Sequence, residues 1–309
     1  MSIADKLLET LNEESVRVQT KDTFYVDGNE FQPGQKKSPP VTVDSLPAGV
    51  YDVKRSYTGV YLERQDIHSD ELIKFEDPRM NLVTNEISAF WEKEDNFKKH
   101  GFIMKRGILL HGAPGCGKSC LIKQVQEQMI EQNNLIFVAR DPGALTKILK
   151  DVREVETERR IVVILEDIDE MVRWDEGSLL ELMDGPDSQH KVLYLGTTNY
   201  LEKLPPRMQR SGRFDRKVEV LPPGKEGRLA YFQAKLGIEE EEAELQEMVD
   251  KTDGLNFGDL REFVIAVYCL EEDPDIAISR IKGGASGIKE SYVTADNLLG
   301  LMEDDEEQE

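Results

Sequence analysis

The chain has 309 residues, of which 39% are hydrophobic and 32% are charged, so we expect packed cores beneath a highly charged surface and exclude a wholly disordered chain. Its 61 acidic and 39 basic residues give a formal net charge of −22, which repels the phosphates of nucleic acids and anionic lipid headgroups. Neither a nucleic acid nor a membrane is therefore the expected partner.

The start of the chain shows no apolar signal core. Residues 1–10 mix charged side chains with leucines and predict a short amphipathic helix. The longest aliphatic run, residues 161–165, is far shorter than the roughly 20 apolar residues of a membrane span. The three cysteines, Cys116, Cys120 and Cys269, lack paired metal-binding spacing and indicate reduced thiols. We therefore expect a cytoplasmic protein without a membrane anchor.

The first part of the chain contains short β-type runs, which are punctuated by prolines and by the turn signal Asp27-Gly28. These runs predict a small β-rich module over residues 1–75, in which no catalytic motif is visible. Residues 81–99 then carry apolar side chains at helical spacing, which predicts a connector helix within residues 76–104. The expected strands of the module are residues 23–26, 41–43, 50–53 and 59–62.

Apolar strands alternate with helical stretches over residues 105–223, which predicts an α/β core built on a parallel sheet with crossover helices. Residues 224–300 favour a small helical domain. The last segment, residues 301–309, contains six acids within its final seven residues, and their repulsion predicts a disordered tail. The expected core strands are residues 108–110, 135–138, 161–165 and 192–195, and the expected helices of the helical domain are residues 225–236, 239–251, 257–270 and 274–281.

Residues 112–119, GAPGCGKS, match the phosphate-binding pattern G-x-x-x-x-G-K-[ST] between an expected strand and an expected helix. Such glycines let backbone N–H groups surround phosphates at a helix N-terminus, while Lys118 faces the β- and γ-phosphates and the Ser119 hydroxyl ligates Mg²⁺. The motif therefore predicts a P-loop site for ATP and Mg²⁺. We interpret Cys116 and Cys120 as residues that fill space in the loop and do not act as a redox switch, because no resolving-cysteine motif accompanies them. The candidate nucleotide-binding residues are Gly112, Ala113, Pro114, Gly115, Cys116, Gly117, Lys118, Ser119 and Cys120.

Two acids, Glu166 and Asp167, directly follow the apolar run of residues 161–165. Because a second carboxylate site of a phosphate cradle belongs at the end of another core strand, we expect both acids on the γ-phosphate side of the P-loop. We place Glu166, with Ser119, on the metal side, where it contacts Mg²⁺ through water, and Asp167 as the base that polarises the attacking water. An exchange of the two roles stays open.

Two further segments are residues 196–199 (GTTN) and 210–216 (RSGRFDR). Together with the P-loop and the two acids, these segments make the chain resemble ATPases of the AAA branch of the AAA+ superfamily. The resemblance covers about residues 105–270. It implies that Asn199 is a sensor that hydrogen-bonds the attacking water, and that Arg210 and Arg213 reach into the nucleotide site of the neighbouring subunit as fingers. It therefore implies a homo-oligomeric ring, a hexamer, that hydrolyses ATP.

Three features depart from the usual family pattern. The two acids occur in the order Glu-Asp instead of Asp-Glu, and residues 140–155 lack the aromatic side chain with which protein-threading relatives grip a peptide. Both features look more similar to the mitochondrial AAA translocase of a folded Rieske iron–sulfur protein than to proteasomal unfoldases. Gly258 stands where other AAA+ branches place a sensor arginine, so we expect the helical domain to be a lid that signals nucleotide state by rigid-body motion.

The motifs favour an ATP-hydrolysing oligomer that remodels or translocates a protein client without aromatic threading, and the module of residues 1–75 would recruit the client or an adaptor. Two alternatives stay open. A nucleic-acid motor or loader would use the same core and turn the basic side chains of residues 147–160 toward the nucleic acid. A nucleotide-gated scaffold would bind ATP and hydrolyse it slowly.

Overall fold

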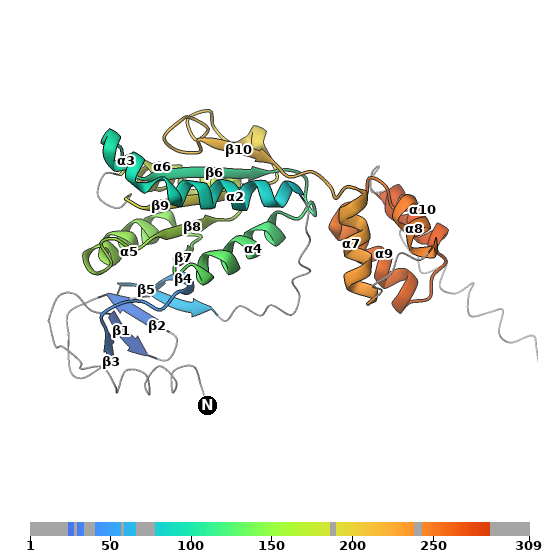
Figure 1. Ribbon diagram of the computed structural model, residues 1–309, viewed down its shortest axis with the longest axis horizontal. Helices are drawn as coiled ribbons and strands as arrows, with labels where there is room; N and C mark the ends of the chain where they lie inside the picture. Colours follow the sequence, from blue (N-terminus) through green and yellow to red (C-terminus); the bar gives the residue numbers. More distant parts are fainter. Residues whose placement is uncertain are drawn as a thin grey trace, which may run out of the picture.

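The computed structural model describes residues 24–27, 30–33, 41–56, 59–65, 78–185, 190–237 and 243–284. Ten strands within this part of the chain form one sheet in the order β10-β6-β9-β8-β7-β4-β5-β2-β1-β3 (Figure 1). Helices cover both faces of the sheet, and a helical domain follows it in the chain. The predicted α/β class with a mostly parallel core sheet and flanking helices is confirmed.

The centre of the sheet consists of parallel strands. Every residue of β8 and β9 is buried, as expected for central strands that are covered on both faces. Because these strands run in parallel, their carboxyl ends lie along the same edge of the sheet, where the P-loop begins after β6. The strands of this part are β6 (Lys105–His111), β7 (Leu135–Val138), β8 (Ile161–Leu165), β9 (Val192–Thr198) and β10 (Arg216–Glu219).

The edge strand β10 was missing from the prediction because its residues, Arg-Lys-Val-Glu, contain no apolar run. It pairs in parallel with β6, and Val218 is its single residue that is not fully exposed. Backbone pairing with β6 therefore defines this strand, and such pairing is invisible to a search for hydrophobic patterns.

The strands of the N-terminal segment continue the core sheet. β4 pairs in parallel with β7, where Val50 lies opposite Ile136, and its other edge pairs antiparallel with β5. The sequence predicts these strands as a separate module, whereas their pairing joins them to the core sheet and covers the edge that β7 would otherwise expose. These strands are β1 (Phe24–Asp27), β2 (Glu30–Pro33), β3 (Val41–Val43), β4 (Gly49–Ser56) and β5 (Gly59–Gln65), of which β2 was not predicted.

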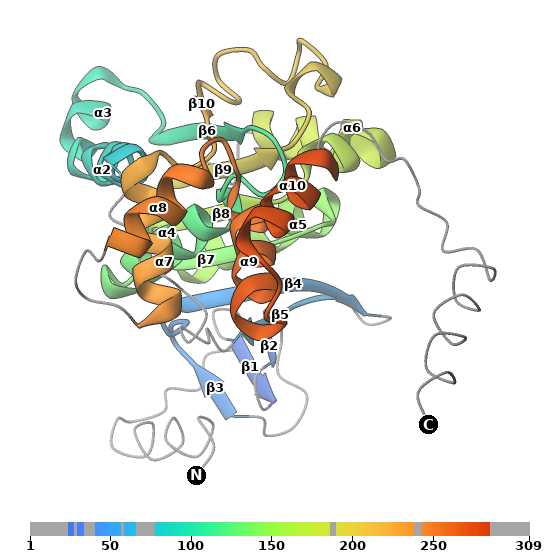
Figure 2. The same cartoon turned by 90° about the vertical axis from the view of Figure 1, so that its right-hand side faces the viewer.

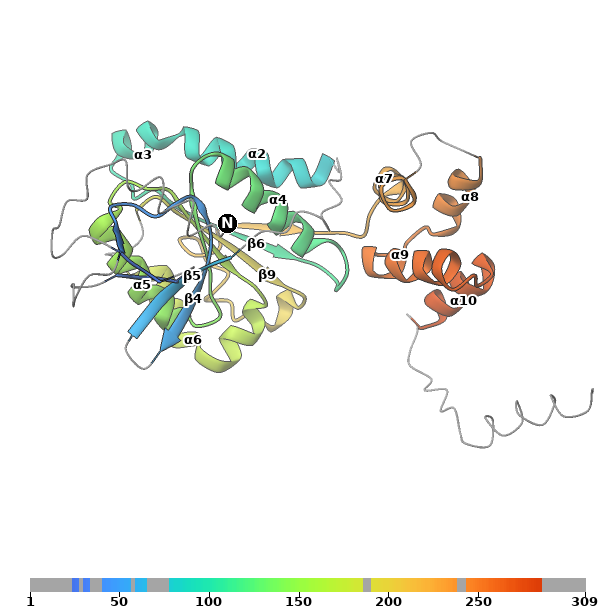
Figure 3. The ribbon, with the colours of Figure 1, turned by 90° about the horizontal axis from the view of Figure 1, so that it is seen from below.

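Helices pack on the two faces of the sheet above two separate hydrophobic clusters (Figures 1 and 3). One face carries α2 (Pro78–Glu92), α3 (Glu94–His100) and α4 (Lys118–Glu131), and the opposite face carries α5 (Pro142–Val155) and α6 (Ile168–Asp184). The connector that we predicted as one helix is divided into α2 and α3, because the backbone of Lys93 leaves the helical range (φ −95°, ψ 16°).

The helical domain follows the residues Leu221–Gly224 and faces the viewer in Figure 2. It consists of α7 (Lys225–Leu236), α8 (Ala243–Lys251), α9 (Phe257–Val264) and α10 (Pro274–Gly284). The helix predicted over residues 257–270 changes after α9 into a π-helical segment, Ile265–Cys269. None of the described helices is both long enough and apolar enough to cross a membrane. The predicted N-terminal helix and acidic tail lie outside the described residues.

Candidate active site

The P-loop connects β6 to α4, and its lysine is held by the loop itself. Lys118 is the first residue of α4 and is only 8% exposed. Its ammonium donates hydrogen bonds to the carbonyl oxygens of Gly112 (2.7 Å) and Ala113 (3.0 Å). Burial lowers the pKa of Lys118. The loop therefore positions one cation at its centre, next to the N-terminus of α4, which attracts anions.

The start of α4 suits a phosphate for a second reason. Gly117 precedes the helix in the left-handed region (φ 99°, ψ 12°), which a residue with a side chain would adopt only under strain, and no side chain caps α4. Cys116 is buried, and burial raises the pKa of both Cys116 and Cys120. Raised pKa values keep both thiols protonated, which agrees with the interpretation that they fill space and do not act as a redox switch.

The two acids after β8 lie at a sharp turn into α6. The backbone of Asp167 is left-handed (φ 49°, ψ 53°), which is uncommon for a residue other than glycine. Its N–H donates a hydrogen bond to the Thr197 hydroxyl on β9 (3.1 Å), and its carboxylate does not cap α6. Burial, and next the charge of Asp167, raises the pKa of Glu166. The turn thus leaves the carboxylate of Asp167 available to the site.

Two threonines at the end of β9 support this turn. Besides the bond from Asp167 to Thr197, the Thr198 hydroxyl donates to the carboxylate of Asp169 (2.6 Å) and accepts a hydrogen bond from the N–H of Tyr200 (3.0 Å). Sequence reasoning missed both threonines as site residues. Their signal was the presence of two hydroxyls at the end of a buried strand, directly before Asn199.

One cavity of about 450 Å³ unites most of the predicted site residues, and its volume suits a small-molecule ligand. Its lining includes residues of the P-loop, the acids after β8, Asn199 after β9 and the start of α9. Gly112, Ala113 and Cys116 are not part of that lining, and the first two contribute through their carbonyl oxygens on Lys118. The predicted residues that line it are Pro114, Gly115, Gly117, Lys118, Ser119, Cys120, Glu166, Asp167 and Asn199.

The helical domain contacts the P-loop directly. The N–H of Phe257 donates to the carbonyl oxygen of Gly115 (2.9 Å), and a Cβ atom on Gly115 would lie 2.4 Å from Oδ1 of Asn256. Asn256 also caps α9 by accepting a hydrogen bond from the N–H of Asp259 (3.0 Å). Phe257 and Gly258 complete the cavity wall. The start of α9 is thus part of the cavity wall, where the sequence predicted no site residue.

The oxygen donors near the P-loop fit a hydrated Mg²⁺. In the described part of the chain, no group of three or more His, Cys, Asp or Glu could hold a metal by itself. The Ser119 hydroxyl and the Glu166 carboxylate line the same cavity, and Mg²⁺ prefers such oxygen ligands while it takes others from phosphates and water. A cation there would also offset the burial that raises the pKa of Glu166.

The two predicted finger arginines do not line the cavity. They lie in the loop between the short turn Leu201–Lys203 and β10. The Arg213 guanidinium is bound within its own chain, to the carboxylate of Asp184 (2.5 Å) and to the carbonyl oxygen of Arg207. Arg210 is exposed, and its side chain makes no hydrogen bond or ion pair with any residue that the structure describes.

Three of the basic side chains that we considered for nucleic-acid binding make contacts within the chain itself. Arg153 donates hydrogen bonds to four carbonyl oxygens, including that of His190 (2.6 Å). Arg159 bonds the backbone oxygen of Asn133 (2.7 Å), and the Arg160 guanidinium lies 5.5 Å from the ring centre of Trp91. These three arginines therefore stabilise the fold and do not form a basic surface.

Comparison with known proteins finds similarity over the central part of the chain. Residues 108–221 match the model of the family described as "ATPase family associated with various cellular activities (AAA)". The chain is 26% identical to a "Cell division cycle protein 48 homolog" of Archaeoglobus fulgidus over 245 residues, which cover 72% of this chain and 33% of that protein.

Two further relatives are nucleotidases. The chain is 30% identical to "Proteasome-activating nucleotidase 1" of Haloferax volcanii over 200 residues, which cover 57% of this chain and 49% of that protein. It is 24% identical to "Proteasome-activating nucleotidase" of Methanocaldococcus jannaschii over 310 residues, which cover 91% of this chain and 67% of that protein. None of these three relatives is a Rieske-protein translocase, so the similarity to that subtype is not supported. The chain spans about half or less of the length of the Archaeoglobus fulgidus and Haloferax volcanii relatives.

Proposed function

We propose that this chain, whose residues 108–221 form an AAA ATPase domain, binds ATP with Mg²⁺ and hydrolyses it within a homo-oligomer. One observation carries the proposal: a single cavity brings together the P-loop, both acids after β8, Asn199 and the start of the helical domain. These are the groups that phosphoryl transfer needs, namely a phosphate cradle, oxygen ligands for a metal and a group that accepts the proton of water.

Each group of residues in the cavity has its own role in ATP hydrolysis. The P-loop N–H groups and Lys118 hold the phosphates, and Ser119 with Glu166 would hold Mg²⁺, which neutralises phosphate charge when it is bound. The carboxylate of Asp167 accepts the proton of the attacking water, and the Asn199 amide holds that water in line. Glu166 is given the metal role because it lines the cavity with Ser119 and is half-buried, whereas Asp167, which lines the same cavity, is exposed.

A neighbouring copy would complete the site. Charge develops on the γ-phosphate oxygens during transfer, yet Lys118 is the single basic residue among the described residues that line the cavity. Arg210 is exposed and unpaired within the described chain, so it can reach into the site of another copy. A guanidinium supplied in this way is worth roughly 10³–10⁵ in rate. This argument supports a ring, for which we propose six subunits.

We propose a protein client, which the names of the relatives support: two are proteasome-activating nucleotidases and one is a cell division cycle protein 48 homologue. Residues 140–155 are almost entirely the helix α5, and they present no aromatic side chain for threading. A nucleic-acid motor has less support, since Arg153, Arg159 and Arg160 are used internally. Recruitment by residues 1–75 and a cytoplasmic location complete the proposal.

The test compares nucleotide affinity with steady-state phosphate release. The wild-type protein should bind ATP and release phosphate in a Mg²⁺-dependent manner, and Lys118→Ala should bind ATP at least about tenfold more weakly because the phosphates lose their counter-charge. Tight ATP binding without turnover would favour the nucleotide-gated scaffold. Unchanged ATP affinity in Lys118→Ala would contradict the assignment of the P-loop.

A further inference from the structure

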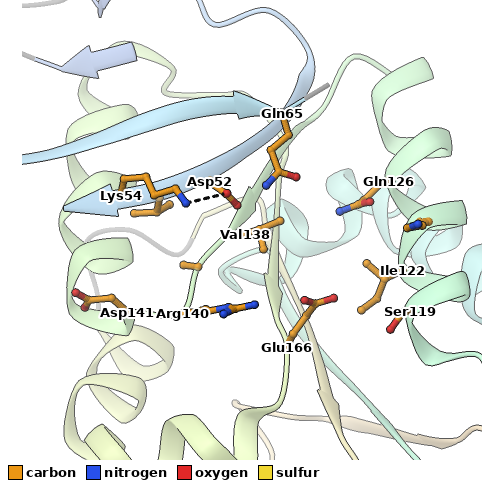
Figure 4. Close-up of a pocket in the computed structure, with 13 residues that line it drawn as sticks. Asp52, Lys54, Gln65, Ser119, Ile122, Gln126, Val138, Arg140, Asp141 and Glu166 are labelled. Atoms are coloured by element: carbon orange, nitrogen blue, oxygen red, sulfur yellow. Dashed lines mark ion pairs between the residues drawn. The ribbon is translucent and has the colours of Figure 1, made fainter. Parts of the chain in front are cut away.

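A second cavity, of about 540 Å³, lies next to Glu166 (Figure 4). The start of α4 forms one wall, and strands β4, β5 and the end of β7 form the others. Ser119 and Glu166 line both this cavity and the nucleotide cavity, so the two spaces meet at the two residues that we assign to Mg²⁺. The second cavity therefore adjoins the γ-phosphate side of the proposed site.

Two of the three acids that line this cavity are already paired. Asp52 lies 3.2 Å from the ammonium of Lys54, and the dashed line in Figure 4 marks this pair. Asp141 lies 2.9 Å from the guanidinium of Arg55, and its carboxylate also caps α5. Neither carboxylate is therefore an uncompensated negative charge in the cavity.

Two basic side chains of the lining have no such partner. Lys123, one helical turn after Ser119 on α4, and Arg140, directly after Ala139 at the end of β7, make no ion pair or side-chain hydrogen bond within the described part of the chain. Both act electrostatically on Glu166, and Figure 4 shows Arg140 extending toward it. Two cations thus act on one half-buried carboxylate, in a chain whose overall charge is −22.

Neutral hydrogen-bond donors complete the cavity. Gln65 on β5 and Gln126 on α4 extend into it from different walls (Figure 4). Amide groups and two unpaired cations are the donors that bind a tetrahedral oxyanion, and the volume leaves room for its water. Glu166 repels an anion, which keeps the binding weak enough for release.

We propose that this second cavity receives the inorganic phosphate that hydrolysis releases, and that Lys123 and Arg140 bind it on its way out. The inference rests on the proposed function, because the phosphate comes from the nucleotide site. While ADP occupies the P-loop, the cleaved phosphate would lie beside Ser119 and Glu166, the two residues that the nucleotide cavity shares with the cavity lined by Lys123 and Arg140.

The test measures binding of inorganic phosphate to the full-length protein saturated with Mg²⁺ and ADP, by calorimetry and by inhibition of steady-state hydrolysis. The variants Lys123→Gln and Arg140→Gln should each weaken phosphate binding about fivefold, since each removes one charged contact. Their ADP affinity should equal that of the wild type. Lys147→Gln is the matched control, because Lys147 is an exposed lysine on α5 outside both cavities.

Unchanged phosphate affinity in both variants would overturn the inference, and so would an equal loss in Lys147→Gln, which would indicate a general charge effect. Failure of the proposed function has a different signature, because phosphate binding is measured without hydrolysis. A wild-type protein that binds no ADP, yet binds phosphate in a manner dependent on Lys123 and Arg140, would refute the nucleotide assignment and leave the cavity as an oxyanion site.

Discussion

The N–H of Phe257 donates a hydrogen bond of 2.9 Å to the carbonyl oxygen of Gly115, and this bond joins the first residue of α9 to the P-loop. Asn256, the preceding residue, packs against Gly115 so closely that a Cβ atom there would lie 2.4 Å from its Oδ1 atom. A shift of the P-loop backbone on nucleotide binding would therefore reach the helical domain through adjacent residues.

The first prediction tests this contact. Gly115 has a φ of 79°, so Gly115→Ala adds roughly 1–2 kcal/mol of backbone strain as well as a clash with Asn256. We expect ADP to bind about tenfold more weakly and hydrogen exchange in α9 to become faster. Gly177→Ala is the control, because Gly177 is exposed on α6 and its added Cβ would meet no atom closer than 3.8 Å. Wild-type affinity and exchange in Gly115→Ala would contradict the coupling.

The second prediction separates the two acids after β8. Asp167→Asn should lower kcat at least about a hundredfold and leave ATP binding intact, because the amide cannot accept the proton of water. Glu166→Gln should instead raise the Mg²⁺ concentration that gives half-maximal activity, because it removes a charged metal ligand. A Mg²⁺ titration of both variants distinguishes the roles, and the reverse pattern would show that the two acids exchange them.

The third prediction concerns the two arginines before β10. Arg213 is held by Asp184 in its own chain, whereas Arg210 is unpaired in the described structure. Arg213→Ala should therefore lower the free energy of unfolding by about 0.5–1 kcal/mol, and Arg210→Ala should leave it unchanged. Arg210→Ala should still suppress hydrolysis with ATP affinity nearly intact, because it acts on the transition state in a neighbouring site.

Two controls sharpen that comparison. Asp184→Asn should reproduce the stability loss of Arg213→Ala, which isolates the structural part of its role. Mixing Arg210→Ala with Lys118→Ala should restore some turnover, because a mixed oligomer contains sites with an intact P-loop beside an intact Arg210. An absence of rescue in verified mixed oligomers would count against shared sites.

The fourth prediction is a pH dependence of stability. Glu94 accepts hydrogen bonds from Lys98 (2.7 Å) and Lys191 (2.9 Å), which lower its pKa from 4.5 to about 2. Since the folded-state pKa is lowered, the stabilisation is complete above the ordinary pKa and is lost as the pH falls from about 4.5 toward 2. Glu94→Gln should therefore cost about 1–2 kcal/mol of unfolding free energy at pH 7 and almost nothing near pH 2.

Denaturant unfolding at several pH values checks this expectation. Glu92→Gln serves as the control, since Glu92 is exposed and forms no ion pair with a described residue. A cost for Glu94→Gln that stays constant from pH 7 to pH 2 would show that the ion pairs do not cause it.

Local patterns predicted the strands that are buried and continuous in the chain. The run of residues 161–165 is apolar throughout, and it forms β8 with the predicted bounds. The polar edge strand β10 was not predicted, because its backbone pairs with β6 while most of its side chains remain exposed. The break at Lys93 and the π-helical segment after α9 escaped it as well, because the apolar spacing continues across both positions.

The phosphate-binding loop, the acids after an apolar run and the resemblance to AAA ATPases could be read from the sequence alone, because each depends on neighbours along the chain. The folded structure was needed to show that β4 pairs with β7, that Arg213 is bound to Asp184 while Arg210 has no partner among the described residues, and that a second cavity shares Glu166 with the first. These relations depend on pairings between distant segments, which leave no period or motif in the sequence.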